Sequence, residues 1–174
     1  MARDKFALGI DFGTESGRVV VIRVRDGEEV GTAVVPYPDG VIDEKLPGGA
    51  RLEPDWALQN PRDYFLVLEK GVPKALSTAR VRAEDVIGIG TDFTSCTLLS
   101  TKRDSTPLCI LPEYRRRPHA WAILWKHHAA QSEADRINEI GRERNEKFIR
   151  VYGGKYSSEW FFSKVLQVLD EANE

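Results

Sequence analysis

The chain has 174 residues, of which 41% are hydrophobic and 30% are charged, and its formal net charge is −2. This composition is typical of a globular protein with an apolar core, and the balanced charge excludes the basic footprint of a nucleic-acid-binding protein. No apolar stretch approaches the length that crosses a membrane, and the first ten residues contain no signal-peptide core. Two cysteines, Cys96 and Cys109, make no disulfide framework. We therefore expect a cytoplasmic protein with free thiols.

Three strands are predicted at the start of the chain. Residues 6–11 form a short apolar run, and residues 18–25 are rich in Val and Ile, which favour strands. Residues 28–37 follow the pair Asp26-Gly27, a strong hairpin signal. Short links between consecutive strands predict an antiparallel meander. The Pro-, Gly- and acid-rich segment 38–59 is too long for a simple connection and is typical of a functional or disordered loop.

A helix is predicted over residues 61–79. Asn60 suits the N-cap and Pro61 the first helical position, while apolar residues recur downstream with helical spacing. Gly71 and Pro73 interrupt the middle of this helix. The next segment, "DVIGIGTDF", predicts a short buried strand, so that strand, helix and strand suggest a parallel crossover.

The second half predicts strands followed by helices. "CTLLS" favours a further strand, and "KRDSTPLC" a turn followed by an extended piece. A helical pattern covers residues 118–141, with Gly141 as its stop. Ser157 or Ser158 would cap a last helix whose buried face carries Phe162, Val165, Leu166 and Leu169. We expect no compact second domain.

The turn within "GIDFGTESGRVVVI" has unusual chemistry for a link between two strands. Asp11 stands at its base, and two glycines and two hydroxyl residues follow. Such a turn suits a phosphate and a metal ion, because glycine-containing turns form anion-binding concavities and carboxylates bind Mg²⁺. A merely polar hairpin is the alternative, since the same residue types are common in turns. The chain contains no dinucleotide-binding fingerprint or Walker A loop, and "YGGKYSS" is better explained as a turn before a helix.

With the β-β-β-α-β order, this turn resembles the first phosphate loop of the sugar kinase, Hsp70 and actin superfamily. The implied fold is α/β and ribonuclease-H-like, a mixed sheet flanked by helices. Five further segments, in the same order, resemble those of the FGGY carbohydrate kinases, in the branch that phosphorylates L-ribulose: "GVIDEKLP", "PDWALQNPRDY", "GIGTDFTSCTLL", "LWKHHAAQ" and "GGKYSSEW".

The resemblance implies an ATP- and Mg²⁺-dependent kinase that converts L-ribulose to L-ribulose 5-phosphate in L-arabinose catabolism. Residues 1–174 would be the N-terminal sugar-binding domain, incomplete, without the second, nucleotide-binding domain. The catalytic base would lie beyond Glu174, so we expect the isolated chain to be inactive. The expected partner is a small sugar, with no nucleic acid and no membrane.

The resemblance also assigns site residues. Asp11, Gly13, Thr14 and Ser16 match the phosphate loop, with Asp11 also a metal ligand. The residues that match sugar-contacting positions are Asp92, Phe93, Thr94, Ser95, Cys96, Trp125, Lys126, Glu159 and Trp160.

Each sugar contact has a structural alternative. Asp92 would cap a strand end, Trp160 would only pack, and Trp121, Trp125 and His128 would form one buried helical stripe. The adjacent His127 and His128 do not have the spacing of a metal pair on one helix.

Two other functions compete with the kinase. The same phosphate loop serves chaperone- and actin-like ATPases, and the chain alone would also suit a non-catalytic binding or assembly module. The "TDFTSCT" and Trp-Lys-His-His segments disfavour the ATPases, which need no sugar site there.

Overall fold

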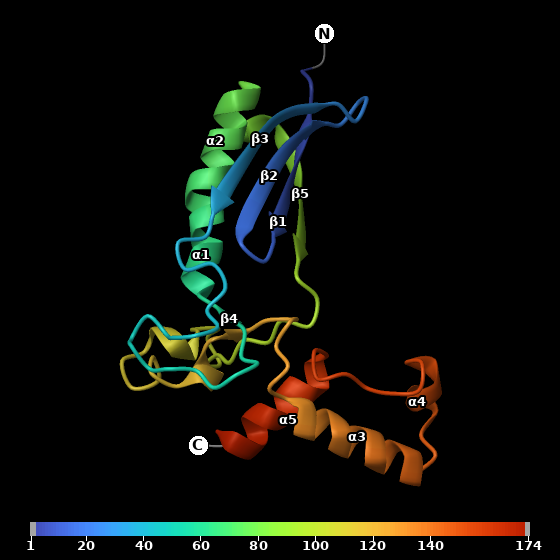
Figure 1. The fold of residues 1–174 in the computed structure, drawn as a ribbon. Coiled ribbons are helices and arrows are strands. Elements are labelled where there is room, and N and C mark those ends of the chain that lie inside the picture. Colours follow the sequence, from blue (N-terminus) through green and yellow to red (C-terminus); the bar gives the residue numbers. More distant parts are fainter. Residues whose placement is uncertain (1–2, 173–174) are drawn as a thin grey trace. The chain divides into compact units, whose positions relative to one another are not determined.

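A four-stranded mixed sheet is the centre of the first of two units into which the chain packs. This computed structural model describes residues 3–172, and residues 3–40 and 60–94 form this sheet unit. The strand order is β3-β2-β1-β5 (Figure 1). The bounds of the strands are Phe6–Phe12 for β1, Ser16–Arg23 for β2, Glu29–Pro36 for β3 and Val86–Phe93 for β5. The first three strands are antiparallel neighbours, and β5 runs parallel to β1, which confirms the predicted β-β-β-α-β order and the mixed α/β sheet.

The predicted helix 61–79 is confirmed, with an internal irregularity. It consists of α1 (Pro61–Leu66), the π-helical turn η1 (Val67–Gly71) and α2 (Val72–Ala79). The Asn60 side chain accepts a hydrogen bond from the backbone N–H of Arg62, as an N-cap should. The π-helical turn ends two residues before Pro73, which has no amide hydrogen for a regular helical bond. The helix therefore continues through its proline.

The core of the sheet unit lies between this helix and strands β1, β2 and β3. Two glycines let the helix approach the sheet closely. A Cβ on Gly17 would lie 2.2 Å from Cγ2 of Val67, and one on Gly31 would lie 2.7 Å from Cβ of Ala79. The buried apolar residues of this core are Leu8, Ile10, Val19, Val21, Ala33, Val35, Tyr37, Val67 and Ala75.

The prediction that "DVIGIGTDF" is a buried strand is wrong in its burial. Ile87, Ile89 and Phe93 on β5 are 61%, 65% and 68% exposed. β5 lies at the edge of the sheet, while α2 packs on β2 and β3. The exposure of these β5 side chains shows that an apolar sequence by itself does not establish burial.

The second unit, the helical unit, combines residues 41–59 with residues 95–172. Residues 41–59, most of the predicted long loop, are therefore packed within this unit. Two short strands, β4 (Leu58–Gln59) and β6 (Ala122–Ile123), pair antiparallel at its centre. The helices are η2 (Ala83–Asp85) in the sheet unit, and η3 (Leu108–Ile110), η4 (Pro118–Ala120), α3 (Gln131–Glu143), α4 (Lys147–Val151) and α5 (Phe161–Glu171) in the helical unit.

The helix predicted over residues 118–141 is wrong in its first half. A 3-10 turn, β6 and two turns precede α3, which begins at Gln131. Gly141 does not stop α3; it lies inside the helix, where a Cβ would approach Ile149 to 2.9 Å. The strand predicted at "CTLLS" reduces to one bridge between Leu98 and Ile123. The turn in "KRDSTPLC" is confirmed by a Thr101–Pro107 bridge, but 3-10 helix η3 follows it.

Helix α5 is confirmed, but its predicted buried face and its cap are wrong. Phe162 and Leu169 are 64% and 57% exposed, whereas Ser163, Lys164 and Gln167 are buried. The N-cap is Trp160, not Ser157 or Ser158. The buried polar side chains form hydrogen bonds with other residues of the helical unit. The polar side of this helix is therefore buried, while two of its large apolar side chains are exposed. None of the helices in residues 3–172 has both the length and the apolar character needed to span a bilayer.

Candidate functional site

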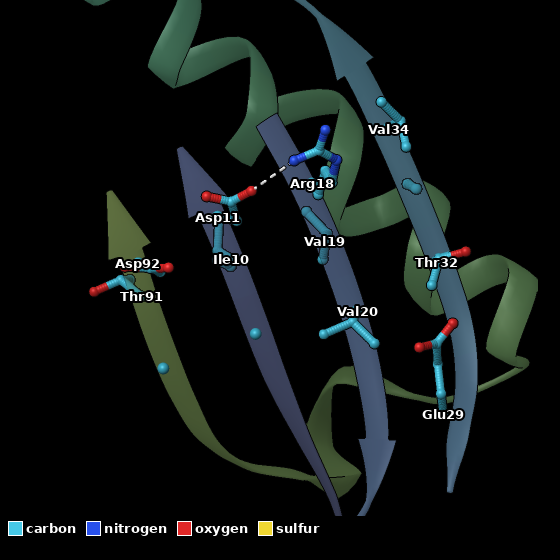
Figure 2. Close-up of a pocket in the computed structure, with 13 residues that line it drawn as sticks. Ile10, Asp11, Arg18, Val19, Val20, Glu29, Thr32, Val34, Thr91 and Asp92 are labelled. Atoms are coloured by element: carbon cyan, nitrogen blue, oxygen red, sulfur yellow. Dashed lines mark hydrogen bonds and ion pairs between the residues drawn. The ribbon is translucent and has the colours of Figure 1, made fainter. Parts of the chain in front are cut away.

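Asp11 lies near the carboxyl end of β1 and pairs with Arg18 on β2. The Oδ2 atom of Asp11 is 3.0 Å from Nη1 of Arg18, and the two residues face each other in the hairpin register (Figure 2). Both side chains are partly exposed, at 38% and 62%, so the ion pair orients the carboxylate more than it stabilises the fold. Sequence reasoning missed Arg18, although the register of the hairpin places it opposite Asp11.

The predicted phosphate loop is a tight turn closed by its own backbone. The N–H of Gly13 donates to the carbonyl of Ser16 at 3.1 Å, and a Cβ on Gly13 would lie 2.9 Å from that oxygen. Glycine is therefore needed here for close approach of the backbone. Because the Gly13 N–H is engaged within the turn, the polar groups that suit a phosphate are the hydroxyls of Thr14 and Ser16.

Asp92 occupies the same register position on β5 that Asp11 occupies on β1. Because side chains alternate along a strand, the two carboxylates lie on the same face of the sheet, at the carboxyl ends of neighbouring parallel strands (Figure 2). Asp92 Oδ1 accepts a hydrogen bond from the N–H of Phe93 at 2.9 Å. A depression of about 570 Å³ extends from these carboxylates across the sheet, and Gly9 and Gly90 contribute no side chains to fill it.

Phe93 and Thr94 lie at the end of the sheet unit, and the remaining predicted sugar contacts lie in the helical unit. Ser95 and Cys96 form a turn in which Cys96 has φ 62°, a left-handed conformation that is uncommon outside glycine. Trp125 and Lys126 are the exposed central residues of another turn, closed by the N–H of His127 donating to the Leu124 carbonyl at 3.2 Å.

Glu159 and Trp160 both have partners within the helical unit. Oε1 of Glu159 is 3.4 Å from Nε2 of His128, and Ser158 lies beside the other nitrogen of that ring. Trp160 packs against Tyr152 and Tyr156, with ring centroids 4.9 Å apart in each case. Trp160 thus has the packed surroundings that its structural alternative describes. Glu159 is oriented by His128.

His127 and His128 have opposite environments. His127 is fully buried, and its Nδ1 accepts a hydrogen bond from the N–H of Ala57 at 3.3 Å. Its proton is therefore on Nε2, which donates to Oε1 of Gln167 at 2.9 Å. His128 is partly exposed and faces Glu159. No group of three or more potential metal ligands occurs among residues 3–172.

Burial lowers the pKa of His127 to about 4, so its neutral form should make stability depend on pH. An unfolded histidine titrates near 6.5, and hence between pH 6.5 and 4 the unfolded chain binds a proton that the folded chain does not. The stabilisation that the neutral His127 gives to the folded state is complete above pH 6.5. It is lost as the pH falls toward 4, and the free energy of unfolding then decreases by up to roughly 3 kcal/mol.

Urea unfolding followed by tryptophan fluorescence measures this loss, because all four tryptophans lie in the helical unit. Between pH 7 and 5 the free energy of unfolding should fall less in His127→Gln than in the unsubstituted chain. His128→Gln, which changes the exposed neighbour, should keep the full slope. Parallel curves for the unsubstituted chain and His127→Gln would contradict the assignment.

The structure thus gathers the predicted residues into two groups, one in each unit. In the sheet unit, Asp11, Thr14, Ser16 and Asp92 lie around the carboxyl ends of β1 and β5. Sequence reasoning missed the partners that orient several of these residues, namely Arg18 in the sheet unit and Lys164 and Gln167 in the helical unit. No short motif marks these partners.

Comparison with known proteins found curated relatives over nearly the whole chain, whereas no family model matches. The ribulokinase of Geobacillus thermodenitrificans is 53% identical over 169 residues, covering 97% of this chain and 30% of the relative. The ribulokinase of Mycolicibacterium smegmatis is 51% identical over 172 residues, covering 98% and 31%. The chain therefore spans about 30% of the length of the curated relatives it matches.

Among solved structures, the gluconate kinase of Lactobacillus acidophilus matches 99% of this chain and 30% of its own, with a TM-score of 0.73 and 17% identity. The glycerol kinase of Plasmodium falciparum, solved with ADP, matches 97% and 29%, with a TM-score of 0.64 and 15% identity. At these identities the likeness concerns the fold, and it confirms the α/β fold predicted for a carbohydrate kinase.

Proposed function

We propose that this chain forms the N-terminal, sugar-binding part of an ATP-dependent kinase that phosphorylates L-ribulose. Bacterial ribulokinases are similar to it over about 30% of their own length. The observation that carries the proposal is the pair of carboxylates, Asp11 and Asp92, in register at the carboxyl ends of β1 and β5. Ligands of open α/β sheets bind at such ends. The nucleotide-binding domain and the catalytic base belong, in this proposal, to the part of ribulokinases that the chain does not match.

The residues at the end of the sheet fit a magnesium ion. Mg²⁺ prefers oxygen ligands, keeps several waters and needs only one or two carboxylates beside the substrate phosphates. Asp11 supplies such a carboxylate, and Arg18 orients it through Oδ2. When bound, the ion would neutralise charge on the phosphates of ATP. The hydroxyls of Thr14 and Ser16 would donate to phosphate oxygens.

The sugar contacts are proposed on chemical grounds. Asp92 would accept charge-assisted hydrogen bonds from sugar hydroxyls. In the helical unit, the exposed Trp125 ring and the Lys126 ammonium are suited to the apolar face and the hydroxyls of a sugar. We assign the same role to the other residues that resemble the sugar site of carbohydrate kinases, namely Phe93, Thr94, Ser95, Cys96, Glu159 and Trp160.

We also propose that the protein is cytoplasmic.

A ribulokinase-length chimera tests this proposal. In it, the present chain replaces the matching segment of the Geobacillus thermodenitrificans ribulokinase, to which it is 53% identical. We expect sugar-dependent ADP formation with MgATP and L-ribulose, at a turnover on the order of 1–100 per second. Glycerol serves as the control sugar and should give little turnover.

Two outcomes would count against the proposal. A folded chimera without L-ribulose phosphorylation would contradict it directly. ATP hydrolysis that does not depend on sugar would favour the chaperone- or actin-like alternative.

A further inference from the structure

Helix α5 turns a polar face toward the segment that carries Trp125 and Lys126. Lys164 is fully buried and Gln167 is 2% exposed, and both side chains reach residues about forty positions earlier in the chain. The two residues are three positions apart, so they lie on the same side of the helix.

Lys164 binds the turn at its first residue. Its Nζ donates to the carbonyl of Leu124 at 3.0 Å, the same oxygen that accepts the N–H of His127 and closes the turn. Burial lowers the pKa of Lys164 to about 8, although the charges of Cys96 and Glu159 act in the opposite direction. Burying an ammonium costs free energy even when charges of opposite sign lie nearby. Stability alone therefore does not account for a lysine at this position.

Gln167 binds the other end of the same segment. Its Oε1 accepts the Nε2–H of His127 at 2.9 Å, and its Nε2 donates to the carbonyl of Ala129 at 3.3 Å. Ala57 binds the same segment through its backbone. Its carbonyl accepts a hydrogen bond from the N–H of Leu124, and its N–H donates to Nδ1 of His127. The turn is thus held by the 55–57 segment and, independently, by two side chains of α5.

We propose that Lys164 and Gln167 are positioning residues, which hold the Trp125–Lys126 turn in the orientation that sugar binding requires. The inference rests on the proposed function, because it takes Trp125 and Lys126 as sugar contacts. A contact misplaced by about 1 Å costs an enzyme on the order of a hundredfold in rate, so a group that fixes a turn affects activity without touching the substrate.

The first experiment measures the turn itself, in the 174-residue chain. Labelling with 5-fluorotryptophan gives four ¹⁹F signals, one for each tryptophan, and Trp125→Phe identifies that of Trp125. Lys164→Met keeps the length of the side chain and removes its ammonium, and Gln167→Met is the second variant. We expect both to shift or broaden the Trp125 signal and to leave the Trp160 signal in place. Lys147→Met, which removes an exposed lysine, is the matched control and should change neither.

The second experiment measures sugar use in the ribulokinase-length chimera. Lys164→Met should raise the KM for L-ribulose about fivefold to tenfold and leave the KM for ATP within about twofold. Its unfolding midpoint should not fall, because the costly buried ammonium is gone while Leu124 keeps its backbone bond. A merely structural lysine would lower stability and leave the two KM values in proportion.

The outcomes separate this inference from the proposed function. An unmoved Trp125 signal in folded Lys164→Met and Gln167→Met chains overturns the inference, as does an unchanged KM for L-ribulose in an active chimera. If the unsubstituted chimera does not phosphorylate L-ribulose, the proposed function fails and the inference fails with it. In that case a shifted Trp125 signal would still show that Lys164 and Gln167 hold the turn, and the error would lie in the assignment of the turn to sugar binding.

Discussion

Asp11→Asn in the ribulokinase-length chimera is expected to lower kcat on the order of a hundredfold and to leave the KM for L-ribulose within about twofold. This is the size of effect that follows when one preorganised charge-stabilising group is removed from an active site. Asn keeps the shape of the side chain but removes the negative charge proposed to hold Mg²⁺. The Mg²⁺ concentration that gives half-maximal rate should rise in parallel, and titrating Mg²⁺ at saturating ATP and sugar measures it.

Arg18→Gln is the matched control for Asp11→Asn. Both substitutions break the 3.0 Å ion pair between Asp11 and Arg18, but only Asp11→Asn removes the carboxylate. Since the pair is partly exposed, its loss should cost at most about 1 kcal/mol of stability. Equal falls in kcat for the two variants would assign the effect to the ion pair. An unchanged kcat in a folded Asp11→Asn chimera would reduce the loop to a polar hairpin.

Asp92→Ala is expected to lower kcat/KM for L-ribulose by about 1.5–3 kcal/mol, which corresponds to roughly tenfold to 150-fold. The loss is that of one hydrogen bond between a carboxylate and a sugar hydroxyl. The KM for ATP should change much less. Steady-state kinetics with each substrate varied at saturation of the other separates the two constants.

The neighbouring position of Asp11 sharpens this test. On sequence grounds the phosphate loop and the "TDFTSC" segment are separate, but the structure places their aspartates side by side in register. If Asp92→Ala raises the Mg²⁺ requirement as Asp11→Asn does, Asp92 belongs to the metal site and its sugar assignment is wrong. Thr91→Val is the control in β5, because it removes a polar group one residue earlier, on the opposite face of the strand.

Where local chemistry decides a structure, short segments of sequence were sufficient. The helix 61–79 follows from Asn60 and Pro61 at its start, and the hairpin before β3 follows from Asp26-Gly27. Capping and tight turns involve hydrogen bonds among residues that are close in the chain, so the residues that form them are adjacent in the sequence. The same locality explains why the turn after Asp11 was recognised.

Where burial or pairing joins remote residues, sequence patterns failed. The apolar β5 is exposed because the helix lies over β2 and β3, and the polar face of α5 is buried because Lys164 and Gln167 meet the 124–129 segment. Neither outcome depends on residues within a few positions of the element concerned.

The candidate site divides in the same way. The identity of Asp11 and Asp92 as polar strand ends could be recognised from composition and order, whereas their common face depended on the parallel pairing of β1 with β5. Register between strands eighty residues apart is set by the packing of the whole sheet, because a shift of one residue would turn each side chain to the opposite face. The local sequence thus determined which residue types stand at the site, and only the tertiary structure decided which of them face one another.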